Sequence, residues 1–270
     1  MATLFSILSW NIKHFRDSPA RVQAVGGYLK KWKPDIFGLF EVEGKEVYPM
    51  MVKEFPQYAL FITEGQQSQE ILVACRKTFQ SITFQQKREF DAGNPHLRPG
   101  ALLSFIRNDQ LCGALFLHTD SGTDAVGFGN RAEIFRHAFN LKRTIDKSQG
   151  NGRLIILGDL NTMGLQYPRQ VKSQTRVEST MEIFNLEEEA TKVKMTVLSK
   201  EEDATWLGSK GKSNLDHIIA STALKFTTYG AAAKPYQVRI DGWAKLAGAE
   251  RTAYLKNISD HCLLYAKVTT

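Results

Sequence analysis

The chain has 270 residues, 43% of them hydrophobic, and a formal net charge of +7. This length and apolar content allow a large buried core, and sheet-rich domains of this size are common, so we expect one domain over residues 1–270. We find no linker, low-complexity segment or repeat of fixed period, which excludes repeat architectures. No apolar run approaches the length of a membrane span, which excludes a chain that crosses the bilayer as a helix.

The positive charge favours an anionic partner such as nucleic acid, phospholipid or a phosphorylated small molecule. Lys and Arg are scattered, so an ordinary solvated surface is the alternative. The cysteines, Cys75, Cys112 and Cys262, fit neither a zinc pattern nor a closed disulfide framework, and we expect buried thiols in a reducing compartment. The N-terminus lacks the features of a signal peptide. We therefore expect a cytoplasmic protein, and no protein partner is inferred.

The first elements predict a strand–helix–strand unit. An apolar strand, Leu4–Trp10, ends at Asn11. A helix with a serine cap and a proline in its first turn is expected over residues 18–33. Residues 35–40 form the next strand, which ends at Glu41. Because such a unit places its strands parallel, the two polar residues should meet at one edge of a sheet.

A second helix is expected over residues 45–55, and the pattern then changes to short strands separated by turns, which is typical of an antiparallel meander. Asn108-Asp109 is typical of a tight hairpin turn. His118 stands at the end of the last strand, and Arg98 lies just before the fourth. The strands of this part are expected over residues 58–63, 70–75, 81–85, 101–107 and 111–118.

The second half of the chain begins with a helix expected over residues 130–147. The apolar run 153–157 then predicts a buried strand, which leads directly into Gly158-Asp159-Leu160-Asn161. A further helix is expected over residues 178–189. Residues 191–199 fit either a strand or an irregular stretch.

The last part of the chain is less regular. Residues 208–213, rich in Gly, Ser and Lys, are expected to form a loop. Residues 214–219 predict a strand that carries Asp216, whereas residues 230–256 show no clear pattern. A final strand is expected over residues 262–268, directly after a pair of polar residues.

Polar residues recur where the predicted strands end. Asp159 and Asn161 are two positions apart, so in an extended chain their side chains point to the same side. A carboxylate beside an amide suits a hard cation and the phosphate it holds, although a strand followed by an Asp–Asn turn is the simpler interpretation. Two mixed sheets packed face to face, with helices outside, would bring all such residues to one rim. The others are Asn11, Glu41, His118, Asp216, Asp260 and His261.

Six motifs occur in the order typical of the endonuclease/exonuclease/phosphatase superfamily, which includes deoxyribonuclease I and exonuclease III. They are LSWNI, GLFEVE, LFLHTD, GDLN, NLDHI and SDH, and they span Leu8 to His261. The resemblance implies an α/β fold: a four-layer sandwich of two mixed β-sheets flanked by helices. Two positions depart from the usual motifs, Phe40 in place of glutamine and Leu160 in place of phenylalanine, and neither removes a functional group.

The resemblance also implies metal ligands. Glu41 matches the principal ligand, with Asn11 beside it and Asp260 as a second acid on the metal side. Oxygen ligands of this kind favour Mg²⁺, with Mn²⁺ or Ca²⁺ as alternatives, over zinc. A divalent cation on a phosphate oxygen neutralises charge in the transition state.

The resemblance implies the remaining roles as well. His261 matches the terminal catalytic histidine and Asp216 the carboxylate that hydrogen-bonds to it. Asp216 lies in an apolar strand, where an unpaired carboxylate would be costly, and His261 is the natural partner. We expect Asp159 and His261 to control the attacking water jointly. The residues expected to contact phosphate oxygens are Asn11, Asn161 and His118, with Arg98 as a weaker match.

The predicted activity is metal-dependent hydrolysis of phosphodiester bonds, and the favoured substrate is nucleic acid, DNA or RNA. One alternative is a phosphatase or phosphodiesterase that acts on a small phosphorylated molecule or a lipid headgroup. A more remote alternative is a non-catalytic nucleic-acid-binding module, which the presence of all the core functional groups disfavours. The fold does not decide between these substrates.

Overall fold

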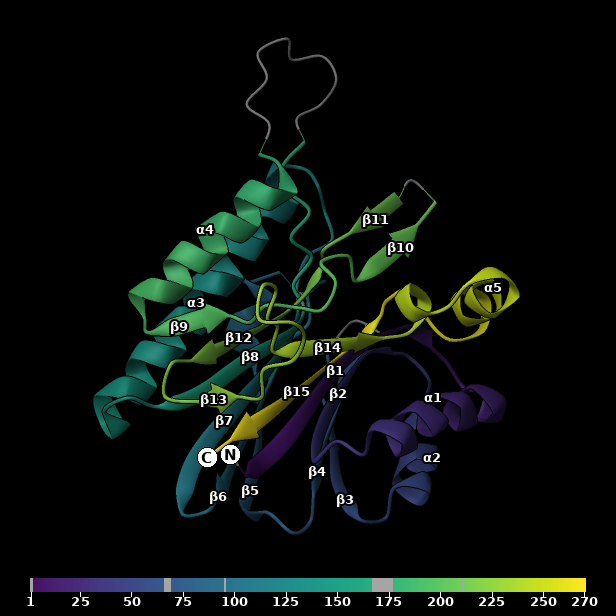
Figure 1. Cartoon of the computed structure of the whole chain (residues 1–270), viewed down its shortest axis with the longest axis horizontal. Coiled ribbons are helices and arrows are strands. Elements are labelled where there is room, and N and C mark those ends of the chain that lie inside the picture. Colours follow the sequence, from purple (N-terminus) through teal and green to yellow (C-terminus); the bar gives the residue numbers. More distant parts are fainter. Residues whose placement is uncertain (1, 66–68, 95, 167–176, 210) are drawn as a thin grey trace.

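Two β-sheets lie face to face, and helices cover their outer sides (Figure 1). The structure is a computed structural model that describes residues 2–65, 69–94, 96–166, 177–209 and 211–270. The first sheet has the strand order β13-β15-β1-β2-β4-β3, with β14 also paired to β15, and the second has the order β5-β6-β7-β8-β12-β9. This arrangement confirms the predicted sandwich.

The first sheet is built mainly from the two ends of the chain. Its central strands β1 and β2 are parallel, and α1 connects them, whereas their outer neighbours are antiparallel. Its strands are β1 (Thr3–Phe15), β2 (Ile36–Val42), β3 (Tyr58–Ile62), β4 (Glu70–Arg76), β13 (Lys225–Phe226), β14 (Val238–Asp241) and β15 (Leu263–Thr269). Its helices are α1 (Pro19–Trp32) and α2 (Val47–Glu54), with α5 (Gly248–Asn257) at one end.

The second sheet repeats this scheme with the middle of the chain. Strands β7 and β8 are parallel and α3 connects them, while α3 and α4 lie together on the outer side (Figure 1). Its strands are β5 (Gln80–Lys87), β6 (Gly100–Arg107), β7 (Gln110–His118), β8 (Arg153–Asp159), β9 (Met195–Val197) and β12 (Asp216–Ser221). The helices are α3 (Ala125–Gln149) and α4 (Ser179–Lys192), with the short helix η1 (Arg88–Asp91).

The apolar run in β8 shows why this strand is buried on both faces. Ile155 and Leu157 belong to the core between the sheets, whereas Leu154 and Ile156 belong to the core under α3 and α4. Alternate side chains point to opposite faces of a strand, so a strand covered on both sides is apolar throughout. The polar motif that begins at Gly158 therefore follows a strand that both cores hold in place.

Several predicted boundaries were wrong. The third helix begins at Ala125 rather than at residue 130, because Asp124 caps its N-terminus by accepting a hydrogen bond from the Gly127 N–H at 2.8 Å. Two glycines in the first turns of this helix interrupt its apolar pattern, so the sequence did not indicate the correct start. The expected loop 208–213 forms most of a small hairpin, β10 (Trp206–Gly208) and β11 (Gly211–Ser213), and its residue 210 lies outside the described residues.

The stretches without clear pattern also acquire structure. Residues 230–256 contain β14, the short helix η2 (Trp243–Lys245) and α5, and residues 191–199 contain the end of α4 and β9. The three cysteines are buried free thiols, as predicted. Within the described residues, no helix is both long and apolar enough to cross a membrane.

The tight approach of the two sheets can be tested at Gly38 in β2. A Cβ atom there would lie 2.2 Å from the Phe116 ring of the facing sheet. We expect Gly38→Ala to lower the free energy of unfolding by about 1–3 kcal/mol, as overpacking of a dense core does. Gly27→Ala in α1 is the matched control, because a Cβ there meets nothing within 4 Å and should stabilise the helix by up to about 1 kcal/mol. Urea denaturation of both variants measures the difference, and equal effects would contradict this packing.

Candidate active site

Three polar residues of the second sheet stand in one row across adjacent strands. The register pairs His118 at the end of β7 with Asp159 at the end of β8, and Asp159 with Asp216 at the start of β12. Strands β7 and β8 are parallel and β12 is antiparallel to β8, so two strand ends and one strand start meet at the same edge. The row follows directly from the sheet topology.

The first sheet contributes residues to the same edge. Glu41 lies near the end of β2, and Asn11 in β1 is in register with the residue before it, Phe40. His261 lies just before β15, where its N–H donates to Ser259 Oγ at 2.9 Å, and this hydroxyl donates to the Asn11 carbonyl at 2.6 Å. The expected meeting of Asn11 and Glu41 at one edge is therefore seen in the structure.

The amide of Asn11 joins the two sheets. Its Nδ2 donates to Glu41 Oε1 at 2.9 Å and to Asp159 Oδ2 at 2.8 Å, while its Oδ1 accepts the Lys13 N–H at 2.8 Å. This last bond sets the orientation of the amide. Sequence reasoning gave the Asn11 oxygen a place on the metal, but here the oxygen is bonded to the backbone and the nitrogen holds the two carboxylates.

These residues line a pocket of about 320 Å³ between the two sheets. The sequence-predicted residues in its wall are Glu41, Arg98, His118, Asp159, Asn161, Asp260 and His261. Asn11 and Asp216 lie beneath it, each bonded to a wall residue. Other wall residues were not predicted as site residues; they include Lys13, His14, Gln69, Ser121 and Met163.

His261 and Asp216 form a buried pair. The ring Nδ1 of His261 lies 2.9 Å from Asp216 Oδ2, and its Nε2 lies 3.7 Å from Asp159 Oδ2. Burial acts to lower the pKa of His261, but the carboxylates of Asp216 and Asp159 outweigh it, and the pKa is raised. The pair can hold a proton on the imidazole and present it to the pocket.

Asp159 and His118 are shifted toward their neutral forms. Burial, with Asp216 and Glu41 adding to it, raises the pKa of Asp159 against the opposing effect of His261. Burial, followed by the charges of Arg98 and His261, lowers the pKa of His118 well below its usual value. The Nε2 of His118 lies 3.6 Å from Asp159 Oδ2 and 3.9 Å from Glu41 Oε1. A neutral imidazole can donate to a phosphate oxygen without repelling Arg98.

The backbone is strained around the pocket. Lys13, His14, Glu41 and Asn161 all have positive φ angles, of 47°, 48°, 60° and 45°. Residues other than glycine rarely adopt this conformation, and such residues cluster at functional sites. At His14 the turn lets the backbone N–H donate to Glu41 Oε2 at 2.8 Å, so the conformation directly orients a carboxylate.

The donor set suits a hard divalent cation. One oxygen each of Glu41 and Asp159 and the Nε2 of His118 lie within 4.8 Å of one another. Two carboxylates this close repel each other unless a positive charge lies between them or one of them is protonated. A second such group combines Glu41 with His14 and Glu43, and a third combines Asp159 with Asp216 and His261. Glu41 belongs to the first two groups, and Asp159 belongs to the first and the third.

Two other predicted residues have different surroundings. Asp260 pairs with Lys13 Nζ at 2.9 Å, and it belongs to none of the groups of possible metal ligands formed by the described residues. Arg98 lines the pocket, and its buried Nε has no hydrogen-bond partner among the described residues. Arg98 is half-buried and lines the pocket, so its guanidinium can contact a phosphate there.

Sequence reasoning did not place His14 or Gln69 in the pocket wall. His14 is exposed, and its Nδ1 lies 2.5 Å from Glu43 Oε1. Gln69 donates to Glu43 at 3.1 Å. The acid at Glu43, two residues after Glu41, was the available signal. The ring of His217, the residue after Asp216, contacts Thr162 at 2.9 Å.

A sandwich of two mixed sheets that gathers acids, histidines and an arginine in one pocket fits an enzyme that handles phosphate esters with a divalent cation. The family model described as Endonuclease/Exonuclease/phosphatase family matches residues 8–261. The chain belongs to this family of phosphoester hydrolases, as the motifs indicated. A search of curated proteins finds no match to the chain.

Solved structures show the same fold at low sequence identity. TDP2 from Caenorhabditis elegans superposes with a TM-score of 0.69 and 17% identity, over 98% of this chain and 97% of that one. A 3′-5′ exonuclease from Neisseria meningitidis has a TM-score of 0.65 and 17% sequence identity, over 98% of this chain and 100% of that one. A mannosyl-6-phosphatase from Bacteroides thetaiotaomicron has a TM-score of 0.65 and 14% sequence identity, also over 98% of this chain and 100% of that one. At these identities the likeness concerns the fold alone.

The bridging role of Asn11 predicts a charge-dependent loss of stability. Asn11→Asp places a third carboxylate beside Glu41 and Asp159, which should raise the pKa values of this group in the folded state above those in the unfolded chain. We expect the free energy of unfolding at pH 7 to be lower than in the wild type by about 1–3 kcal/mol, and this difference should decrease as the pH falls through the range where carboxylates become protonated. Added Mg²⁺ should also reduce the difference.

Asn11→Leu is the neutral control. It removes the same hydrogen bonds but adds no charge, so its loss of stability should change less with pH and Mg²⁺ than the loss in Asn11→Asp. Thermal denaturation of the variants against wild type measures both effects. A loss in Asn11→Asp that is independent of pH and Mg²⁺ would contradict the convergence of carboxylates described above.

Proposed function

We propose that the protein is a Mg²⁺-dependent phosphodiesterase that hydrolyses nucleic acid. The observation that carries the proposal is the convergence, in one pocket, of two carboxylates joined by an amide, a histidine–aspartate pair and the half-buried Arg98. Phosphodiester hydrolysis requires a site for a cation, a group that transfers a proton, and a positive charge that stabilises the phosphoryl oxygens. The carboxylates, the histidine–aspartate pair and the arginine could meet these requirements in that order.

The residues divide the chemistry between them. Glu41, with Asp159 near it, would hold the cation, which supplies positive charge beside the phosphoryl oxygens when bound. Asp159 and His261 jointly orient the attacking water and move its proton. Asp216 holds the His261 ring by its Nδ1. Arg98, His118 and Asn161 contact phosphate oxygens, and Asn11 acts by positioning the two carboxylates. Asp260 acts indirectly, through Lys13.

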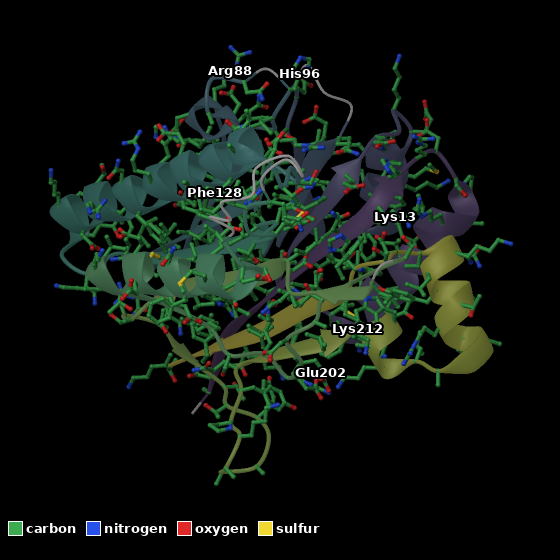
Figure 2. The ribbon with its side chains drawn as sticks, turned by 90° about the horizontal axis from the view of Figure 1, so that it is seen from above. Lys13, Arg88, His96, Phe128, Glu202 and Lys212 are labelled. Atoms are coloured by element: carbon green, nitrogen blue, oxygen red, sulfur yellow. The ribbon has the colours of Figure 1, made fainter. Side chains whose placement is uncertain are left out.

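A basic pocket beside the catalytic one supports a polymeric substrate. It has a volume of about 730 Å³ and shares Lys13 and His14 with the catalytic pocket, while Arg16, Arg21 and Lys256 provide further positive charge. Figure 2 shows Lys13 on the side of the molecule where α1 and the yellow α5 come together. A strand cut at the central pocket would have a place for its neighbouring phosphates.

Two solved structures support the same substrate class. One is TDP2 from D. rerio complexed with a single-strand DNA product, at 16% identity and a TM-score of 0.62. Another is a 3′ phosphatase from Neisseria bound to a product DNA hairpin, at 16% sequence identity and a TM-score of 0.64. Both belong to proteins that share the fold, and they support DNA as the first substrate to test.

A small phosphorylated molecule is the second candidate. The fold is shared with a mannosyl-6-phosphatase, and a catalytic pocket of about 320 Å³ is within the range of small-ligand sites. A non-catalytic binding module is the third, and the retained acid, amide and histidine groups count against it.

We expect metal-dependent cleavage of DNA or RNA that is lost in two near-isosteric variants. Glu41→Gln and Asp159→Asn should each reduce turnover by roughly 100- to 10,000-fold, because each removes a charged group that the reaction requires. The assay compares supercoiled plasmid, linear duplex, single-stranded DNA and RNA in Mg²⁺ or Mn²⁺. Cleavage that survives in both variants would point to a contaminating nuclease. Activity confined to small phosphate esters would select the second candidate.

The basic pocket predicts a change in salt dependence. Lys13→Ala and Lys256→Ala should weaken binding of single-stranded nucleic acid and reduce the slope of log K against log salt by about one unit for each phosphate that is no longer neutralised. Hydrolysis of bis(p-nitrophenyl) phosphate, which does not reach this pocket, should change little with Lys256→Ala.

Lys225→Ala is the control for the salt experiment. Lys225 is exposed in β13 and pairs with Thr269, at the end of β15 opposite His261. Its loss removes the same charge from a distant surface. A slope that changes as much in this variant as in the other two would show that net charge alone, and not the basic pocket, governs binding.

A further inference from the structure

Lys200 is a buried lysine behind the catalytic pocket. It lies in the segment between β9 and β10, and 8% of its surface is exposed. Its Nζ donates to the backbone carbonyl of Asp216 at 2.7 Å and to Oδ1 of Asn214, and it lies 3.5 Å from Nδ1 of His217. The ammonium therefore has an acceptor for each of its three N–H groups, and all three acceptors are neutral atoms.

These contacts belong to a closed ring of hydrogen bonds. The hydroxyl of Thr162 donates to the Asn214 carbonyl at 2.6 Å, so it accepts from the His217 Nε2–H at 2.9 Å. The Nδ1 of His217 is then the acceptor that faces Lys200. Burial, followed by the charge of Lys200, lowers the pKa of His217 well below its usual value. The ring ties the loop after β8 to the start of β12.

Thr205 completes the support of the catalytic pair from the same segment. Its Oγ1 accepts the backbone N–H groups of Leu215 and Asp216 at 3.1 and 3.0 Å, and its carbonyl accepts the Cys262 N–H at 2.7 Å. The backbone of Asp216 is thus held at its N–H by Thr205 and at its carbonyl by Lys200. The chain next to His261 is held by the same residue, Thr205.

The hydrogen bonds of Lys200 do not by themselves explain why a charged side chain is buried at this position. Burial lowers the pKa of Lys200 to about 8, with Asp216 and Asp203 acting in the opposite direction, so the ammonium is charged at neutral pH. Of the other charged groups on adjoining elements, Glu201 is paired with Lys245 at 2.8 Å. Burying a charge among neutral acceptors is costly, and an uncharged donor could satisfy the same atoms.

We propose that Lys200 is a positioning residue for the Asp216–His261 pair: its ammonium fixes the start of β12, and its positive charge stabilises the Asp216 carboxylate that holds the His261 ring. This role rests on the proposed function, because it assigns Lys200 to the same reaction. The Oδ1 of Asp216 has no hydrogen-bond partner among the described residues, and the Asp216 charge favours the charged form of Lys200 against the effect of burial, so the two opposite charges stabilise each other.

The position of Lys200 predicts which kinetic constant it affects. It is not in the wall of the catalytic pocket, so it acts through Asp216 and not on the substrate. We expect Lys200→Met to lower kcat for bis(p-nitrophenyl) phosphate with Mg²⁺ by about 10- to 100-fold, the usual effect of losing a group that orients a catalytic one. KM should change little, because the groups that bind the substrate are all retained.

The pH profile separates the charge from the hydrogen bonds. In the wild type, kcat should fall as the pH rises through about 8, where Lys200 loses its proton. This decrease in kcat should be absent in Lys200→Met.

Thr162→Val is the matched control. It breaks the ring of hydrogen bonds at Thr162 but keeps the Lys200 ammonium, so the decrease in kcat should remain even if the variant is less stable. A decrease in kcat that persists unchanged in Lys200→Met would overturn the proposal.

A spectroscopic measurement tests the proposal without turnover. The proton on Nδ1 of His261, which bonds to Asp216, can be followed by ¹H–¹⁵N NMR in the wild-type protein. Its resonance should shift as the pH passes through about 8. Lys200→Met should lack this shift but keep any shift caused by Asp159, which lies 3.7 Å from the other ring nitrogen. A resonance that is insensitive to Lys200 ionisation in the wild type would overturn the proposal even if no variant folds. Because the signal needs no substrate, a failure of the phosphodiesterase assignment would be seen separately, as absent hydrolysis by the wild type.

Discussion

One amide nitrogen lies between two carboxylates that belong to different sheets, and the geometry of the site depends on it. The Nδ2 of Asn11 donates to Glu41 and to Asp159 at 2.9 and 2.8 Å. For this to happen, the parallel strands of both sheets must end at the same level, and the chain at Glu41 must adopt a positive φ angle. The arrangement brings two carboxylates together, and their mutual repulsion favours the binding of a cation between them.

Much of this could be predicted, because several candidate site residues lie at the ends of apolar strands. The run before Asp159 is buried on both faces, and its length and composition revealed both the strand and the position of the acid. The strand–helix–strand order was sufficient to place Asn11 and Glu41 at one edge. The pairing of His261 with Asp216 could be expected, because an aspartate in an apolar strand needs a partner, and the two lie 2.9 Å apart.

What could not be predicted depends on contacts between segments without periodic patterns. The orientation of the Asn11 amide is set by a backbone N–H in a strained turn, which no local pattern reveals. Lys200 follows a stretch that fitted neither a strand nor a loop clearly, and only the fold shows that its side chain is buried. His14 is exposed, and no local pattern shows that its backbone N–H donates to Glu41 and so brings it to the pocket.

The division of the site between the sheets has a consequence for how the protein becomes active during folding. Asn11 and Asp159 are separated by 148 positions in the chain, and the bond from Trp10 to the carbonyl of His261 spans 251. Contacts of such long range form late and slowly, since the loops between them must close first. Neither sheet alone carries enough of the pocket to act. The proposed activity therefore requires the fully assembled sandwich, because a partly folded chain would lack the arrangement of residues that the pocket provides.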